Sequence, residues 1–186
     1  PGRPARVRLS YAVQDTADGT AHAVLAGQAF VGGDPFLVLN ADNLYPVDAM
    51  RALVTCDTRA LAAFTRASLE HDSGFPPARV AAFASVDCDA EGWLTGLREK
   101  PPVDALAPTT RVSMNLWRLD RAMLAACAEV ALSPRGEREL PEAVMLAVAR
   151  GTPVRVIDVR GVVLDLTTAA DVDVVSRALA GTERRP

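Results

Sequence analysis

Two aspartates follow apolar runs in this chain, far apart in the sequence but in similar settings. Asp42 comes shortly after the apolar residues 36–39, and Asp165 follows residues 161–164. In open α/β sheets, ligands bind at the carboxyl ends of the strands, where loops and helix N-termini converge. A carboxylate there can bind a hard divalent cation, and Mg²⁺ uses only one or two protein carboxylates. If the two strands are neighbours, Asp42 and Asp165 can share one cation.

Each aspartate also has a simpler interpretation. Asp42-Asn43 after a strand is ordinary turn chemistry. Asp165 can equally be a solvated residue ahead of a helix capped by Thr168. The positions alone leave a metal site and a structural role open.

The charged pair Glu99-Lys100 precedes Pro101 at the end of another expected strand. A lysine there is a point charge that can neutralise a phosphate, and a glutamate accepts hydrogen bonds from sugar hydroxyls. Charged residues at strand ends are also commonly just solvated. The pair is therefore weak evidence by itself.

A further group lies near the start of the chain, where Gln14 precedes Gly19 and Thr20. A glutamine amide offers a donor and an acceptor to the edge of a nucleobase, and a glycine lets the backbone approach a planar ring. The same residues also fit a loop that leads into a helix with Thr20 as its N-cap. His22 is expected on the surface of that helix.

Strand and helix patterns alternate along the chain, which is typical of an α/β sheet covered by helices. Residues 36–39 are continuously apolar between turn signals, as in a central strand buried on both faces. Residues 87–92 supply the turn of a hairpin, and residues 72–77 form a loop. The predicted strands are residues 6–13, 36–39, 60–65, 79–86, 93–98, 111–119, 154–157 and 162–166. The predicted helices are residues 21–29, 46–53, 121–132, 140–148 and 169–179, with Thr20, Asp120 and Thr168 as N-caps.

Composition narrows the class of protein. A chain of 186 residues with 49% apolar and 23% charged residues is expected to fold as one globular domain. A net charge of -3 argues against a nucleic-acid partner. No apolar run approaches the ~20 residues of a membrane helix, and the N-terminus has no secretory signal. The cysteines, Cys56, Cys88 and Cys127, show no paired spacing, which favours reduced thiols and a cytoplasmic location.

Taken in order, these segments resemble the family of sugar-1-phosphate nucleotidyltransferases, over nearly the whole chain. The similar segments are the base-recognition stretch (residues 11–14 and 19–24), the metal-binding strand (36–42), the sugar-phosphate motif (98–101), the start of a late helix (139–143) and the segment of the second metal aspartate (164–171).

The resemblance implies a Rossmann-like three-layer α/β/α domain with a mixed, mostly parallel sheet. It also implies in-line attack of a sugar-1-phosphate oxygen on the α-phosphorus of a nucleoside triphosphate, UTP or dTTP favoured, with release of pyrophosphate. The implied roles are Mg²⁺ binding by Asp42 and Asp165, which with Lys100 are the catalytic residues, nucleotide binding by Gln14, Gly19 and Thr20, and sugar-phosphate binding by Glu99, Lys100 and Asn115.

Several features depart from the family pattern. The family's opening strand and Gly-rich loop, which grip the triphosphate, have no counterpart, so residues 1–186 are expected to form a single, N-terminally incomplete domain that lacks about 60–90 residues. Such a chain is not expected to transfer nucleotides by itself. Val163 and Thr167 stand where the family commonly has Trp and Gly, and Asn115 stands near a usual Gly.

Two other functions remain open at this point. One is a non-catalytic module that binds a nucleotide or a sugar phosphate. The other is a glycosyltransferase of related topology, in which Asn40-Ala41-Asp42 replaces an acidic metal-binding triplet. The oligomeric state, a homo-oligomer included, is also open.

Overall fold

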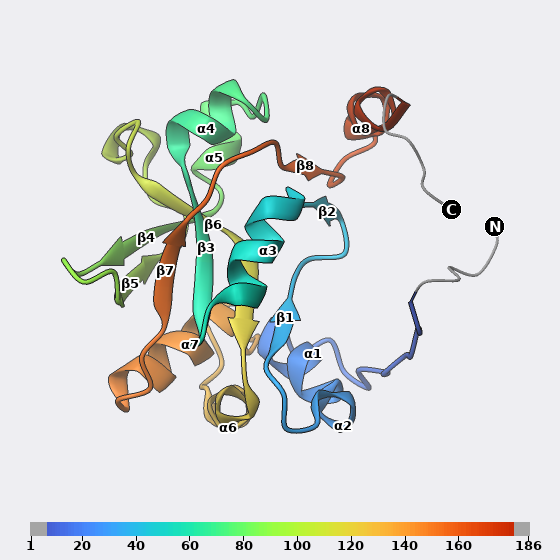
Figure 1. Cartoon of the computed structure of the whole chain (residues 1–186), viewed down its shortest axis with the longest axis vertical. Coiled ribbons are helices and arrows are strands. Elements are labelled where there is room, and N and C mark those ends of the chain that lie inside the picture. Colours follow the sequence, from blue (N-terminus) through green and yellow to red (C-terminus); the bar gives the residue numbers. More distant parts are fainter. Residues whose placement is uncertain (1–6, 181–186) are drawn as a thin grey trace.

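The computed structural model describes residues 7–180 and has a six-stranded sheet at its centre (Figure 1). Its strand order is β5-β4-β6-β3-β7, and β1 pairs with β6 beside this path. The strands are β1 (Phe36–Val38), β3 (Ala60–Thr65), β4 (Ala84–Cys88), β5 (Leu94–Arg98), β6 (Arg111–Leu119) and β7 (Arg155–Asp158). A separate two-stranded ladder joins β2 (Asn43–Leu44) to β8 (Leu164–Asp165).

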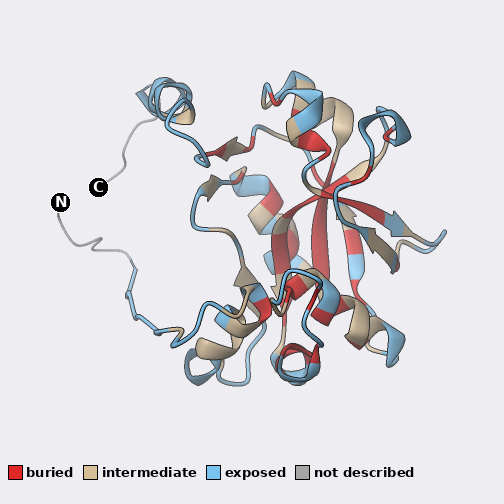
Figure 2. Cartoon of the chain, turned by 180° about the vertical axis from the view of Figure 1, so that it is seen from behind, coloured by how far each residue is buried: buried red, intermediate tan, exposed pale blue. Residues whose placement is uncertain are grey.

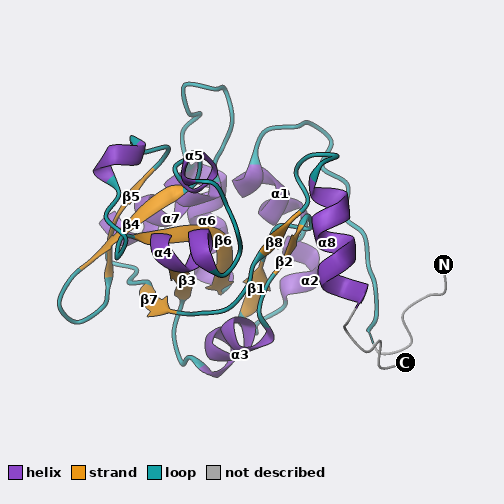
Figure 3. Cartoon of the chain, turned by 90° about the horizontal axis from the view of Figure 1, so that it is seen from above, coloured by secondary structure: helices purple, strands orange, loops and turns teal. Residues whose placement is uncertain are grey.

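Helices cover both faces of this sheet (Figure 3). They are α1 (Thr20–Ala26), α2 (Gln28–Val31), α3 (Val47–Thr55), α4 (Arg66–His71), α5 (Pro77–Val80), α6 (Arg121–Glu129), α7 (Leu140–Ala149) and α8 (Asp171–Ala180), with a 3-10 turn at Val103–Ala105. One apolar cluster joins one face of the sheet to α1, α6 and α7, and a second joins the other face to α3, α4 and α5. The predicted three-layer α/β/α class is therefore confirmed. None of the helices within residues 7–180 is long and apolar enough to span a membrane.

The sheet is mixed, as predicted, and most of its strands share one direction. β1, β3, β4 and β7 run the same way, whereas β5 and β6 run in the opposite direction. Most ladders are nevertheless antiparallel, because β6 lies between β3 on one edge and both β1 and β4 on the other. Among the described strands the parallel ladder is that of β3 with β7.

The two central strands, β3 and β6, have the bounds predicted from the sequence. β3 is buried on both faces: Ala60, Ala62 and Phe64 belong to one apolar cluster, and Leu61 and Ala63 belong to the other. This alternation follows from the two-residue period of a strand. Figure 2 shows the buried residues concentrated along these inner strands.

Several other predictions are confirmed with small shifts at the ends. Asp120 caps α6 by accepting a hydrogen bond from the Ala122 amide at 3.0 Å, although the helix ends at Glu129 instead of residue 132. The predicted hairpin is the antiparallel pair β4–β5. Pro46 lies at the N-cap of α3.

The predicted strand of residues 6–13 is wrong for its described part, since Arg6 lies outside the described residues. Residues 7–13 form no ladder within the described chain, and Tyr11 and Val13 are 84% and 80% exposed. An alternating pattern becomes a strand only where a partner strand supplies hydrogen bonds. The described sheet offers no such partner to this segment.

The prediction that residues 36–39 form a central strand is also wrong. β1 spans three residues, all half-buried, and Leu39 is exposed. Among the described strands β1 pairs only with β6, so its other edge is free. The apolar run therefore reflects packing on both faces, with Phe36 and Val38 against one apolar cluster and Leu37 against the other, on a strand that has only one described neighbour.

Three helix starts differ from the predictions. Gly19, not Thr20, is the N-cap of α1, and Gly27 separates α1 from α2. Pro77 starts the short helix α5 inside the segment predicted as strand 79–86, because the fixed φ of proline suits a first helical position. α8 begins at Asp171 instead of residue 169, since Thr168 is bonded to the Asp171 side chain ahead of the helix.

Candidate functional site

Strand pairing along one edge of β6 is interrupted at Asn115, in the middle of that strand. Val38 of β1 is opposite Trp117, and Ala84 of β4 is opposite Ser113, so Asn115 lies between the ends of two strands that share one edge of β6. Its φ of 56° is in the left-handed region, which asparagine tolerates better than most residues. The irregularity thus separates β1 from β4 and leaves a gap at the carboxyl end of β1.

A cleft of about 610 Å³ lies beside this gap and along β1. Its walls are mostly apolar residues of α1, α2 and β1. Three polar residues reach it from different segments, namely Thr20, Asn40 and Asn115. The structure therefore brings the predicted nucleotide residue Thr20 and the predicted sugar residue Asn115 to one cavity. Such apolar clefts with a few convergent polar groups are typical ligand sites.

Gln14 and Gly19, predicted to bind the base, contact each other. The Gln14 Nε2 atom donates to the Gly19 carbonyl at 3.0 Å and lies 3.1 Å from His22 Nδ1. Gly19 has a φ of +95°, and a Cβ atom there would lie 2.5 Å from the Arg138 carbonyl oxygen. This glycine is thus required by close backbone packing. Gln14 and Gly19 do not line the cleft that Thr20 reaches.

Thr20 ties the start of α1 to the start of α7. Its Oγ1 accepts a hydrogen bond from the Leu140 amide at 2.8 Å, and the Ala21 amide donates to the Arg138 carbonyl at 2.9 Å. These contacts fix the predicted base-recognition segment against the start of α7, two segments far apart in the sequence.

Glu99 and Lys100 follow β5 toward the same gap in the sheet. Arg98 is opposite Ser85, so Glu99 reaches the level of Ala84, the first residue of β4, and Lys100 extends past β4 on the side of Asn115. Lys100 has a φ of 46° and is exposed. No hydrogen bond or ion pair within residues 7–180 joins Lys100 to Asp42 or Asp165, so the two predicted charge groups make no direct contact.

A buried acid lies near Glu99 and Lys100. Glu139 is bound by the guanidinium fork of Arg135 at 3.1 and 2.6 Å, and this hydrogen bonding holds the pKa of Glu139 below its usual range. Desolvation of the Glu99 carboxyl group, followed by the charge of Glu139, raises the pKa of Glu99, although the residue as a whole is exposed. The positive charge of Lys100 acts on both carboxylates.

The β2–β8 ladder brings the two predicted metal aspartates to neighbouring backbone positions. Asn43 is the Cα partner of Asp165, and the Leu166 amide donates to the Asp42 carbonyl at 2.9 Å. Asp42 is exposed, whereas Asp165 is 6% exposed. The segments of the two aspartates are thus neighbours through β2 and β8, although the apolar strand ahead of Asp42, β1, pairs with β6.

Tyr45 lies close to both of these carboxylates. Its hydroxyl donates to the Met114 carbonyl at 2.6 Å, beside Asn115. Burial is the largest cause that raises the pKa of Tyr45, and the charges of Asp42 and Asp165 raise it further. The neutral phenol thus links the aspartate pair to the middle of β6.

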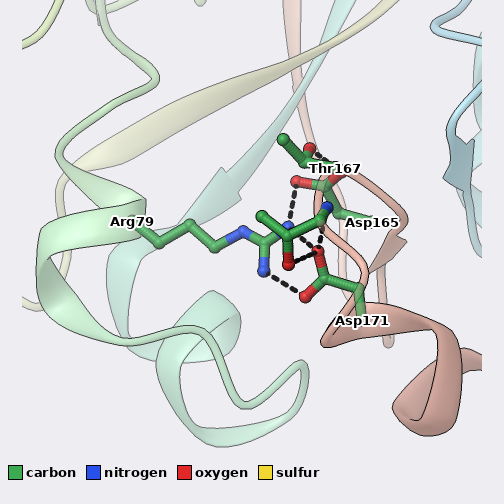
Figure 4. Close-up of polar contacts among 5 residues, drawn as sticks. Arg79, Asp165, Thr167 and Asp171 are labelled. Atoms are coloured by element: carbon green, nitrogen blue, oxygen red, sulfur yellow. Dashed lines mark hydrogen bonds and ion pairs between the residues drawn. The ribbon is translucent and has the colours of Figure 1, made fainter.

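Sequence reasoning missed Arg79, the main partner of Asp165 (Figure 4). Its guanidinium lies 3.0 Å from Asp165 Oδ2 and donates to both oxygens of Asp171 at 2.7 and 3.1 Å. Thr167 Oγ1 donates to Asp165 Oδ1 at 2.7 Å. The Pro76-Pro77 pair was the available signal, because proline at a first helical position would have placed Arg79 on a helix.

Comparison with known proteins identifies the family. A family profile described as nucleotidyl transferase matches residues 2–171. The chain belongs to this family. A glucose-1-phosphate thymidylyltransferase of Actinoplanes sp. is 31% identical over 166 residues, which cover 89% of the chain and 52% of that relative. One from Mycolicibacterium smegmatis is 27% identical over 151 residues, covering 78% of the chain and 47% of the relative.

Solved structures agree with this nucleotidyl transferase fold. UDP-glucose pyrophosphorylase from Acinetobacter baumanii has a TM-score of 0.71 and 20% identity, over 97% of the chain and 64% of that structure. A UDP-glucose pyrophosphorylase complexed with UDP-glucose also has a TM-score of 0.71, with 19% identity over 94% of the chain and 66% of that structure. The nucleotidyl transferase chain spans about half the length of the curated thymidylyltransferases that it matches.

The donor set of this nucleotidyl transferase suits Mg²⁺ chemically. Two carboxylates on adjacent backbone segments, Asp42 and Asp165, match the one or two that Mg²⁺ takes from proteins. The Asn43 Nδ2 atom, on the residue after Asp42, is buried without a hydrogen-bond partner, but it is an N–H donor and therefore no ligand for a cation. Within residues 7–180 no group of three or more acidic, histidine or cysteine side chains gathers, so water and phosphate oxygens would have to complete the coordination. The Arg79 ion pair already neutralises one of the two carboxylates.

Proposed function

We propose that the polypeptide carrying this chain joins a sugar-1-phosphate to a nucleoside triphosphate, with UTP or dTTP favoured, giving a nucleotide sugar and pyrophosphate. A phosphate oxygen of the sugar-1-phosphate attacks the α-phosphorus in line. The new P–O bond forms as the bond to pyrophosphate breaks, and pyrophosphate leaves with the bonding electron pair. Membership of the nucleotidyl transferase family supports this reaction, as does the similarity to the thymidylyltransferases.

The base is assigned to the Gln14–Gly19–Thr20 segment. Gln14 uses its amide NH₂ group on Gly19 and His22, and its Oε1 atom makes no hydrogen bond with the described residues. That free acceptor suits the imide N–H of uracil or thymine. The contacts of this segment with Arg138 and Leu140 hold the backbone in place before a nucleotide binds.

The sugar phosphate is assigned to the end of β5 and the gap in β6. Lys100 supplies a positive charge for the phosphate, and Glu99 and Asn115 supply hydrogen-bonding groups for the sugar hydroxyls. The exposure of Lys100 and its location past β4 leave its ammonium group accessible to such a ligand.

Asp42 and Asp165 are the residues that would hold Mg²⁺, which when bound supplies positive charge to the phosphates. The chain's own work is to position the reactants, since phosphoryl transfer needs little covalent chemistry from a protein. The single observation that carries the proposal is that Thr20, Asn40 and Asn115, from three separate segments, line one cleft. Leu140 also lines this cleft, and it follows Glu139, whose charge acts on Glu99.

Pyrophosphate release tests this proposal. The complete polypeptide that carries this chain is incubated with Mg²⁺, glucose-1-phosphate and UTP, dTTP, ATP or GTP in turn. We expect release with UTP or dTTP, and an Asp42→Ala variant is expected to lose about 10²-fold or more of it. Asp48→Ala is the matched control, because Asp48 is an exposed aspartate on α3 paired with Arg51. No release with any of the four nucleotides, or full activity of Asp42→Ala, contradicts the proposal.

A non-catalytic binding module is the second candidate. The observation that favours it is the Arg79–Asp165 ion pair, which places a fixed positive charge at a proposed metal ligand. Calorimetric binding of UTP or UDP-glucose without any pyrophosphate release would support this candidate over the enzyme.

A further inference from the structure

Asp165 has no carboxylate oxygen without a partner. Oδ2 is 3.0 Å from the Arg79 guanidinium, and Oδ1 accepts the Thr167 hydroxyl at 2.7 Å. Its side chain is only 5% exposed, so water contributes little to its solvation. The protein itself therefore balances the charge of this carboxylate.

Arg79 is held in place from three sides. Its guanidinium lies 5.0 Å from the centre of the Phe75 ring and forms a two-pronged hydrogen bond with Asp171 at the start of α8. The Asp171 carboxylate in turn accepts the Thr168 amide and hydroxyl at 2.7 and 2.9 Å. A planar guanidinium suits such bridging, because its five donors can serve two carboxylates at once.

We propose that Arg79 is a built-in counter-ion of Asp165 that competes with a divalent cation for this carboxylate. This inference rests on the magnesium role proposed above for Asp165. A cation at Asp165 meets the positive charge of Arg79 at close range, in a site where solvent screens little. Asp171 offers the guanidinium a second carboxylate, so Arg79 can release Asp165 while remaining paired.

The competition predicts that loss of the Arg79 charge tightens cation binding. Mn²⁺ affinity is measured from the fall of the free Mn²⁺ signal in electron paramagnetic resonance, on the complete polypeptide without nucleotide. We expect Arg79→Gln to bind Mn²⁺ about tenfold more tightly than wild type, because removal of a nearby like charge favours the cation. Asp165→Asn is expected to lose this site.

Arg59→Gln is the matched control. Arg59 forms a comparable two-pronged ion pair with Asp120, both contacts at 2.9 Å, at the start of α6. Its removal takes away the same charge but should leave Mn²⁺ affinity unchanged. Arg79→Lys keeps the charge but lacks the planar guanidinium fork, so its Mn²⁺ affinity should lie between those of wild type and Arg79→Gln. It also serves if the Gln variant does not fold.

The outcomes separate this inference from the proposed function. If Arg79→Gln or Arg79→Lys binds Mn²⁺ no more tightly than wild type while Asp165→Asn loses the site, the competition is refuted and the metal role of Asp165 stands. An equal gain in Mn²⁺ affinity in Arg59→Gln also refutes the competition, because the gain would then be a general effect of removing positive charge. If no variant binds Mn²⁺ at Asp165, both the competition and the metal role fail.

Discussion

Gly19 lies in a left-handed backbone conformation against the Arg138 backbone, at the start of the proposed base-binding segment. A side chain cannot fit there, because a Cβ atom would lie 2.5 Å from the Arg138 oxygen. Gly19 is therefore expected to serve two purposes, close approach to a base and close packing against Arg138. The packing can be tested separately.

Gly19→Ala should lower the free energy of unfolding by about 2 kcal/mol or more, since it adds both backbone strain and a steric clash. Urea unfolding followed by circular dichroism measures the loss. Gly33→Ala is the control, because a Cβ atom at Gly33 meets nothing within 4 Å, and its cost should stay within about 0.5 kcal/mol. Equal losses in the two variants would show that the contact with Arg138 is unimportant.

At the scale of elements, α8 depends on very few contacts with the rest of the chain. The helix has no buried residue, and Val172 and Val174 are about half-exposed. Asp171 in its first turn is bound to Arg79 of α5 at 2.7 Å. A polar network, and not an apolar face, therefore joins α8 to the described body of the protein.

This network makes the attachment sensitive to acid. The hydrogen bonds from Arg79, followed by the Thr168 amide, hold the pKa of Asp171 well below its usual range. Because the folded pKa is lower than the unfolded one, the stabilisation is present at neutral pH. It is lost as the pH falls below about 4, the ordinary value for aspartate, toward the folded pKa.

Wild type should therefore be more stable than Asp171→Asn at pH 7, and this difference should shrink as the pH falls from about 4 to about 2. Urea midpoints at several pH values measure it. Asp173→Asn removes a charge from the same helix without touching Arg79, so it should change the midpoint little. A wild-type advantage over Asp171→Asn that stays constant with pH would contradict the assignment.

At the scale of the whole molecule, both apolar clusters share the strands β3 and β6. Phe64 and Met114 face one cluster, whereas Leu61 and Trp117 face the other. Because the same two strands border both clusters, unfolding of β3 and β6 disrupts the packing of both clusters at once. The layers are therefore expected to unfold together.

Phe64→Ala should cost about 3–5 kcal/mol, because Phe64 is fully buried. The midpoint should fall equally by circular dichroism and by tryptophan fluorescence, measured in a Trp93→Phe background so that Trp117 on the opposite face is the reporter. Val54→Ala, at a 62% exposed position of α3, is the control and should shift neither. A Trp117 signal that keeps its wild-type midpoint would show that the two faces unfold independently.

The sequence by itself determined the features that depend on local pattern. Residues 60–65 and 111–119 were predicted as strands with the bounds that β3 and β6 have, because continuous apolar or alternating runs report burial directly. The N-cap Asp120 and the β4–β5 hairpin follow from local hydrogen bonding and turn chemistry. The α/β/α class and the family follow from the order of such segments.

Only the tertiary structure decided which strands have partners and which charges meet. The run at residues 36–39 does not reveal that β1 has a free edge, and residues 7–13 alternate without finding a ladder. Asp165 is a candidate site residue from the sequence alone, but its counter-ion Arg79 is 86 positions away in the chain. Local patterns encode burial and turns, whereas such pairs form only when the fold closes distant segments together.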